Sequence, residues 1–325
     1  MLANGWQAII CQCRGDWQFY CDAFYFPQWN TGRRMCWLCQ ASSTARDLSW
    51  TDCSAESGWR STMFNHESFV KRMRDQGEAL PILFKEVVGF RLECVMIDVL
   101  HTVDQGIASH IIGSIFWLLA VVRGVFGGRS MKEKVKRLDA KLQQWYKDTK
   151  CTSRIQGPLS VDKLRNASKS AKLKAKAAAT RHVAKFALLL MQTFGTNSLE
   201  DRLALLVAQH LCEFYEILNS ESMFLSESAR KRIPTVGQQL AYAFMKLSSL
   251  AEDANQKLWR MVPKLHLWEH LTEWQALYHG NPRYFWTYGD EDLVGFMVEI
   301  AETCHPRTMA ISTVMKWLHL HFGRS

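Results

Sequence analysis

Residues 107–122, IASHIIGSIFWLLAVV, are the most apolar stretch of the 325-residue sequence. The stretch is only 16 residues long and contains Ser109, His110 and Ser114. A helix that crosses a bilayer needs about 20 predominantly apolar residues. We therefore predict a helix buried in a protein core, and we expect no membrane partner.

The chain from about residue 106 onward has a helical pattern. Apolar residues recur there at steps of three and four, as at Val135, Leu138, Leu142 and Trp145. Ser198 is a candidate N-cap, and Pro234 and Pro263 are candidate first residues of helices. Gly280 is expected to close the helix that begins at Pro263. The pattern predicts a long all-α portion.

The chain before this portion is mixed. Two short runs, residues 6–13 and 92–97, are rich in residues that favour β-strands. Residues 40–62, rich in Ser, Thr, Gly and Asp, are expected to be irregular. Asn65 is a candidate N-cap for a helix that ends before Gly77. We therefore predict a small α/β portion ahead of the helices.

The composition is that of a folded protein with a basic surface. Apolar residues make up 48% and charged residues 22%, which excludes a disordered chain. A net charge of +9 favours a polyanionic partner. The 10 cysteines are scattered and no signal peptide precedes them, so we expect reduced thiols in the cytosol or nucleus.

Two aspartates follow the β-prone runs directly. Asp16 comes after the first run and Asp98 after the second. Neighbouring strands bring their ends together, and Mg²⁺ requires such a convergence of carboxylate oxygens. The alternative is that each aspartate caps a turn or a helix.

Three acids, Asp290, Glu291 and Asp292, precede an apolar periodic run. They fit the first turn of a helix, where they complement the helix dipole. The alternative is that one carboxylate is delivered from the helix N-terminus to a metal.

The segment His266-Leu267-Trp268-Glu269-His270 matches the H-x-x-E-H pattern of inverted zinc proteases. Histidines four residues apart share a helix face and suit a zinc ion. Such an enzyme needs a distant third ligand, for which the only downstream candidates are Glu299 and Glu302.

Cys36 and Cys39 form a C-x-x-C pair, which is half of a zinc site. Cys53 with His66, or Cys11 with Cys13, would complete four ligands. The alternative is that these residues are thiols without a metal.

A tract without acidic residues runs from 163 to 185. Its cations are expected to contact DNA phosphates: Lys163, Arg165, Lys169, Lys172, Lys174, Lys176, Arg181 and Lys185. The alternative is an ordinary solvated helix.

Together these motifs resemble the catalytic domain of eukaryotic cut-and-paste DNA transposases, closest to the CACTA type. Asp98-Val99-Leu100-His101 resembles the short motif, ending in His, that follows the second Asp of that family. The segment PKLHLWEHL (263–271) with GNPRYFWTYGDEDLVG (280–295) resembles the closing block that carries the catalytic Glu.

The resemblance implies an RNase H-like core interrupted by a helical insertion, with an Asp, Asp, Glu triad that binds two Mg²⁺ or Mn²⁺ ions. Asp16 and Glu291 would be metal ligands, with carboxylates within about 8 Å of each other. Asp98 and His101 would border the same cleft. The family's first Asp lies dozens of residues before its second, so this chain is expected to be a fragment with impaired catalysis.

We thus predict an α+β fold, predominantly α, with a partial core at 1–105, an insertion at 106–275 and a C-terminal part at 276–325. The predicted function is that of a nuclear, transposase-derived protein that binds DNA, with Mg²⁺ (or Mn²⁺) and Zn²⁺ as candidate cofactors and a homo-oligomer allowed. The alternatives are a non-catalytic DNA-binding or scaffold protein and, less favoured, the zinc protease.

Overall fold

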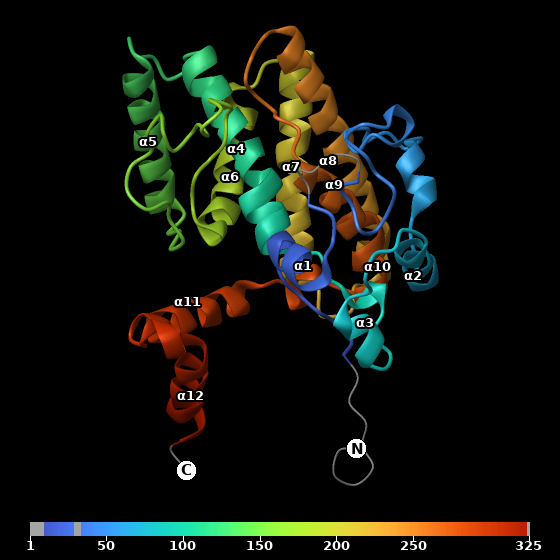
Figure 1. The fold of residues 1–325 in the computed structure, drawn as a ribbon. Helices are drawn as coiled ribbons and strands as arrows, with labels where there is room; N and C mark the ends of the chain where they lie inside the picture. The colour runs from blue at the N-terminus through green and yellow to red at the C-terminus, as the bar shows by residue number, and fades with distance from the viewer. Residues whose placement is uncertain (1–9, 29–33, 324–325) are drawn as a thin grey trace. The chain divides into compact units, whose positions relative to one another are not determined.

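The computed structural model describes residues 10–28 and 34–323, which form helices joined by loops (Figure 1). The α-helices are α1 (Trp17–Phe24), α2 (His66–Asp75), α3 (Ile82–Glu86), α4 (Ala108–Trp117), α5 (Met131–Asp148), α6 (Ala177–Phe194), α7 (Leu199–Ser220), α8 (Glu227–Asp253), α9 (Pro263–His270), α10 (Ala276–His279), α11 (Tyr288–Glu302) and α12 (Met309–Phe322).

The chain divides into two compact units, Met1–Phe285 and Trp286–Ser325. The first unit contains α1 to α10, and the second is a hairpin of α11 and α12. The sequence pattern changes near residues 105 and 275, whereas the two compact units separate between Phe285 and Trp286.

Helix α4 is the centre of the first unit. All ten of its residues are buried, and it packs against α6 and α7. Two π-helical segments, η5 (Leu100–Ile107) and η6 (Leu118–Val122), extend it to 23 residues. This helix is long and apolar enough to cross a membrane, but 83% of its most apolar window is buried inside the protein. The predicted core helix is thus confirmed.

The helices around α4 form a continuous layer. Helix α7 packs between α6 and α8, and α8 packs against α9 (Figure 1). A buried ion pair fixes part of this layer: Arg181 on α6 donates to Asp104 of η5 at 2.6 Å. The Tyr215 hydroxyl on α7 donates to the same carboxylate at 2.6 Å.

Most predicted helix boundaries are confirmed. Asn65 caps α2 through the Ser68 amide, and Ser198 caps α7 through the Asp201 amide. Gly280, with φ of 83°, ends the helix that starts at Pro263. The start predicted at Pro234 is wrong, because α8 begins at Glu227 and contains this proline.

The predicted α+β class, with its partial RNase H-like core, is wrong. Residues 10–28 and 34–323 contain isolated bridges but no β-strand. Residues 6–9 of the first β-prone run lie outside the described part. The rest of that run meets the second run at a single parallel bridge, Cys13 with Val95. The Cys13 amide donates to the Cys94 carbonyl at 2.6 Å, and the Met96 amide donates to the Cys13 carbonyl at 2.8 Å.

The pairing stops after one bridge because each run passes directly into a helix. The Asp16 carboxylate caps α1 by accepting from the Phe19 amide at 2.6 Å. Asp98 likewise accepts from the Leu100 and His101 amides. A side chain replaces the next strand: Gln275 accepts from the Ile97 amide and donates to the Val95 carbonyl, both at 2.7 Å. The buried backbone is satisfied without a sheet.

Gly237 allows α8 to approach the helix that carries His266 and His270. A Cβ atom built on Gly237 would overlap the Thr272 side chain. The Gly237 carbonyl also accepts from the Trp268 indole at 3.0 Å. We predict that Gly237→Ala lowers the free energy of unfolding by roughly 1–3 kcal/mol through overpacking.

Urea denaturation measures this change. Gly295→Ala is the matched control, because a Cβ atom there meets nothing within 4 Å and Ala favours a helix. Equal stability of the Gly237→Ala variant and the unsubstituted protein would contradict the close approach.

Candidate metal centre

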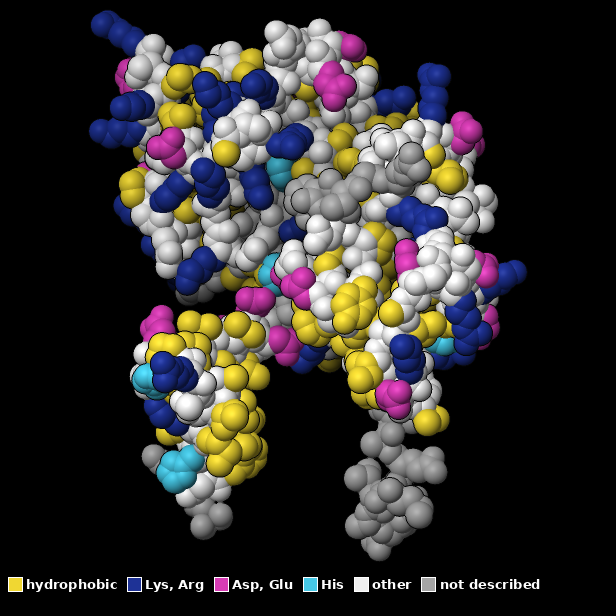
Figure 2. Space-filling view, viewed as in Figure 1, with side chains coloured by type: hydrophobic (Ala, Val, Ile, Leu, Met, Phe, Trp, Pro, Cys, Tyr) yellow, Lys and Arg dark blue, Asp and Glu magenta, His cyan; other side chains and the backbone are white. Residues whose placement is uncertain are grey.

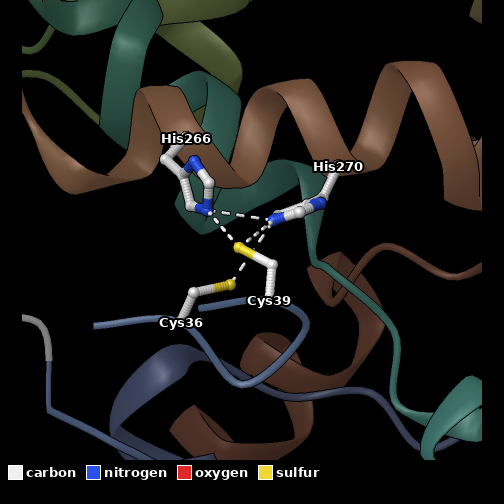
Figure 3. A group of neighbouring side chains, drawn as sticks. All are labelled: Cys36, Cys39, His266 and His270. Carbon is white, nitrogen blue, oxygen red and sulfur yellow. Dashed lines mark hydrogen bonds between the residues drawn. The ribbon is translucent and has the colours of Figure 1, made fainter. Parts of the chain in front are cut away.

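Four ligand side chains from two distant parts of the first unit meet in its interior (Figure 3). Cys36 and Cys39 come from the loop between α1 and α2, and His266 and His270 lie one turn apart on α9. All four are buried, and their ligand atoms lie within 4.8 Å of one another. A buried Cys₂His₂ cluster that could hold a metal ion is thus present.

The distances within the cluster can be compared with a tetrahedral zinc site. Cys39 Sγ lies 3.3 Å from His266 Nε2 and 3.5 Å from His270 Nε2. Cys36 Sγ lies 3.4 Å from His270 Nε2. Zinc bond lengths of about 2.3 Å to sulfur and about 2.0–2.1 Å to nitrogen give a sulfur–nitrogen edge of about 3.6 Å. The cysteine–histidine distances fit this geometry.

The two imidazoles are slightly closer together than a metal would hold them. Their Nε2 atoms are 2.9 Å apart, whereas a tetrahedral zinc site has a nitrogen–nitrogen edge of about 3.3 Å. A shift of a few tenths of an ångström between the two rings would admit the ion.

Backbone amides support the two sulfur atoms. The Leu38 amide donates to Cys36 Sγ at 3.3 Å, and the Ala41 amide donates to Cys39 Sγ at 3.4 Å. Burial opposes ionisation of the Cys36 thiol, but a hydrogen bond with Cys39 and the charges of both histidines lower its pKa well below the usual value. Burial and the neighbouring Cys36 raise the pKa of Cys39. The loop is therefore arranged to hold one negative charge, on the sulfur of Cys36.

An aromatic ring and an ion pair enclose the cluster. The edge of Trp59 contacts both imidazoles, with ring centroids 4.5 Å from His266 and 5.2 Å from His270. Glu269, between the two histidines in sequence, is fully buried and accepts from Arg60 at 2.6 Å. Burial raises the pKa of Glu269, against the opposing effect of Arg60. Residues 58–62 therefore cover one side of the cluster.

The cluster favours a closed structural site over the zinc-protease interpretation of residues 266–270. A catalytic zinc keeps one coordination position open for water, whereas here four side chains converge on one point. The Glu269 carboxylate is engaged with Arg60. Glu299 and Glu302, the predicted third ligands, lie on α11 in the second unit.

The predicted half site is confirmed as part of a cluster, but its predicted partners are wrong. Neither Cys53 with His66 nor Cys11 with Cys13 completes the set. The actual partners lie 227 and 234 positions away in sequence. Both halves carry a sequence signal, and only their pairing was missed.

A second site, which we call the charged pocket, contains Asp16 and Asp98. It has a volume of about 430 Å³. Its ionisable lining residues are Asp16, Asp98, His101, His110, Lys172, Arg260 and Lys264. Asp16, Asp98 and His101 thus line one pocket, and both carboxylates also cap helices as in the alternative interpretation.

A lysine charge faces the two aspartates in this pocket. Burial and Lys172 lower the pKa of Lys264 to about 8, while Asp16 and Asp98 act in the opposite direction. Asp98 is held further by His101, whose Nδ1 lies 2.7 Å from its carboxylate. The pair of carboxylates is thus balanced by protein side chains.

Glu291 lies in the first turn of α11, as predicted. This helix belongs to the second unit and Asp16 to the first, and each unit is described by itself. The convergence of Asp16 with Glu291 on Mg²⁺ therefore stays a prediction.

The basic tract is not one helix. Residues 163–176 form a loop with one bridge, Arg165 with Ala171, and α6 begins only at Ala177. Several of its cations have structural partners: Arg181 pairs with Asp104, and Lys185 lies 3.7 Å from Glu216.

Other cations of the tract contact the loop itself or the core. Lys163 donates to the Pro158 carbonyl at 2.9 Å, and Arg165 stacks on Trp117 at 4.4 Å. Four lysines of the tract are exposed: Lys169, Lys174, Lys176 and Lys185, the last of which lies beside Glu216.

No protein-family model, curated protein or solved structure matches the chain. The resemblance to DNA transposases therefore stays a prediction from the sequence motifs.

The ion pair beside the metal cluster gives a direct test of its surroundings. Arg60→Ala would leave Glu269 buried without its partner, so we predict a loss of roughly 3–5 kcal/mol in the free energy of unfolding. The double variant Arg60→Ala/Glu269→Gln should recover most of this loss, because the remaining carboxylate that loses its ion pair, Glu273, is partly exposed.

Chemical denaturation of both variants measures the effect. Arg91→Ala is the control, since its pair with Glu67 is exposed and should contribute less than about 1 kcal/mol. An Arg60→Ala variant as stable as the control would mean that the ion pair does not support this region.

Proposed function

We propose that the chain is a DNA-binding protein of transposase origin whose fold is held by a structural Zn²⁺ ion and which does not cleave DNA. The observation that carries the proposal is the buried convergence of Cys36, Cys39, His266 and His270. The proposal adds three claims to this cluster: the metal is zinc, the partner is DNA, and the protein does not cleave it.

The ligand set favours zinc over the alternatives. Two thiolates and two imidazoles in a tetrahedral arrangement are typical of structural zinc sites, whereas Mg²⁺ requires oxygen ligands. A bound Zn²⁺ would tie the loop after α1 to helix α9. It would also neutralise the charge of thiolates that are otherwise buried.

DNA binding is supported by the surface of the loop before α6. Lys169, Lys174 and Lys176 are exposed, and Lys257 and Arg260 contact the same loop through Ser168. Figure 2 shows Lys and Arg side chains gathered over this part of the molecule and over α5. Such a surface attracts phosphates without reading base sequence.

The groups around Asp16 and Asp98 support the proposal that the protein does not cleave DNA. Both carboxylates accept hydrogen bonds from helix amides, and Lys264 supplies a positive charge beside them. This arrangement leaves little need for a divalent cation. A Mg²⁺ or Mn²⁺ site on Asp16 and Glu291 stays a prediction, as do a nuclear location and a homo-oligomer.

The metal is tested by its content and by its effect on stability. We predict about one Zn²⁺ per chain, and Cys39→Ser should lose the ion and lower the free energy of unfolding by roughly 3–5 kcal/mol. Mass spectrometry of the native protein and thermal unfolding with and without a chelator measure both effects.

The control for this variant is Cys53→Ser. Cys53 is equally buried and lies beside Glu269, but it is outside the cluster. It should keep its zinc. A purified protein that binds no zinc, or loses none on Cys39→Ser, would contradict the structural-zinc proposal.

DNA binding is tested by reversing three exposed charges. Lys169→Glu/Lys174→Glu/Lys176→Glu removes three candidate phosphate contacts, so the slope of log affinity against log salt should flatten by about 3. Fluorescence anisotropy with a duplex at several salt concentrations measures the slope.

The matched control is Lys71→Glu/Lys85→Glu/Lys231→Glu, which makes the same charge change on α2, α3 and α8. An equal loss in both variants would reduce the effect to net charge. With Mg²⁺ or Mn²⁺ we expect no nicking of supercoiled plasmid. Nicking that Asp98→Asn abolishes would contradict the non-cleaving part of the proposal.

A further inference from the structure

The charged pocket holds several cations and a buried imidazole whose Nδ1 atom has no hydrogen-bond partner among the described residues. We infer that this pocket is a binding site for a terminal phosphate group, carried either by a nucleic-acid end or by a free phosphate ester. The four metal-centre residues and the exposed Lys169, Lys174 and Lys176 lie outside the pocket lining, whereas Arg260 borders both the pocket and the loop before α6.

His110 is the first observation. Its side chain lines the pocket from α4, and the residue is only 5% exposed. Within the part of the chain that the structure describes, its Nδ1 atom has no hydrogen-bond partner. Buried polar atoms are nearly always paired, so an orphan nitrogen in a pocket wall indicates a missing ligand.

Three cations surround this imidazole. Burial and the charges of Lys172, Arg260 and Lys264 together lower the pKa of His110 to about 3. These three side chains reach the pocket from two separate loops, the one before α6 and the one between α8 and α9, and from the first turn of α9. A shared anion would relieve their mutual repulsion and favour protonation of the imidazole, whose Nδ1 would then donate to the anion.

The backbone is shaped to bring Lys264 to this position. The Lys264 Cδ atom would lie 2.9 Å from a Cβ atom built on Gly106, so a larger residue here would push the Lys264 side chain aside. In the described residues, Lys264 makes no hydrogen bond or ion pair. Its position is therefore fixed by packing while its ammonium group stays available.

The size and walls of the pocket favour a chain end over a continuous backbone. A volume of about 430 Å³ lies in the range of small-molecule sites. Trp17, Trp37 and Leu267 form an apolar wall beside the charged groups. A terminal phosphate is also more negative than a phosphodiester, and Asp16 and Asp98 would offset only part of the cationic charge.

A phosphate site in the pocket rests in part on the proposed DNA binding, and the experiment distinguishes phosphate recognition from general DNA binding. Anisotropy would compare one 20-base-pair duplex with 5′-phosphate and with 5′-hydroxyl ends. Calorimetry would measure the binding of two free ligands, adenosine 5′-monophosphate and inorganic phosphate. We expect about tenfold tighter binding of the phosphorylated duplex, or binding of the free phosphates at up to millimolar concentration.

Lys264→Met and Lys172→Met should each remove this phosphate recognition, while Lys246→Met, at an exposed lysine on α8 outside the pocket lining, should retain it. Methionine keeps the apolar stem of the side chain, and zinc content with circular dichroism confirms folding. If Lys264→Met fails to fold, the half-buried Lys172 supplies the test.

A preference for the phosphorylated duplex would assign the site to nucleic-acid ends, and binding of the free phosphates alone would assign it to a small phosphate ester. The Lys169→Glu/Lys174→Glu/Lys176→Glu variant separates the two proposals. If this variant loses general DNA binding but still recognises phosphate, the result would support the phosphate site in the pocket. No preference and no binding of either free ligand, or recognition unchanged in both Met variants, would overturn the inference.

Discussion

The first unit depends on the meeting of two cysteines from an N-terminal loop with two histidines on α9. The four ligand atoms are buried together, and the sulfur and nitrogen atoms approach to 3.3–3.5 Å. Without a cation, such a cluster would bury polar groups and at least one charge, which is costly in a protein interior. With one, the same cluster becomes a cross-link between segments more than 220 positions apart, as the 227-residue separation of Cys39 and His266 shows.

This cross-link matters because the segment that it fixes has little regular structure. Between α1 and α2 the described residues form only short 3₁₀ turns, η2 (Arg46–Leu48) and η3 (Gly58–Thr62). The loop is nevertheless well packed, with Trp37 and Trp59 buried against its neighbours. A metal site and a few large aromatic side chains thus stabilise a segment that backbone hydrogen bonds alone would leave weakly held.

Local signals in the sequence were sufficient for most of the predicted helix boundaries, although the start of α8 was wrongly placed at Pro234. The apolar run at 107–122, the cap at Asn65 and the stop at Gly280 each follow from neighbouring residues. The strands failed because a β-prone run needs a partner. Here the partner of residues 95–97 is the amide of Gln275 and a single residue, Cys13. No residue within 92–97 indicates that Gln275 and Cys13 will take the place of a neighbouring strand.

The site was predictable in pieces. The spacing of Cys36 with Cys39, and of His266 with His270, each indicated half of a metal site, but contacts over such separations leave no mark on a single sequence. The placement of Asp16 and Asp98 beside one pocket followed from the idea of two adjacent runs. The lysine that balances them, Lys264, carried no motif. The basic tract was visible from composition, yet only the fold shows that Arg181 pairs with Asp104 inside the protein.

The most direct test of the central claim is X-ray absorption at the zinc edge of the purified protein. The account predicts a four-coordinate ion with two sulfur ligands at about 2.3 Å and two nitrogen ligands at about 2.0–2.1 Å. A shell made of oxygen and nitrogen without sulfur, or the absence of zinc from a folded protein, would contradict it.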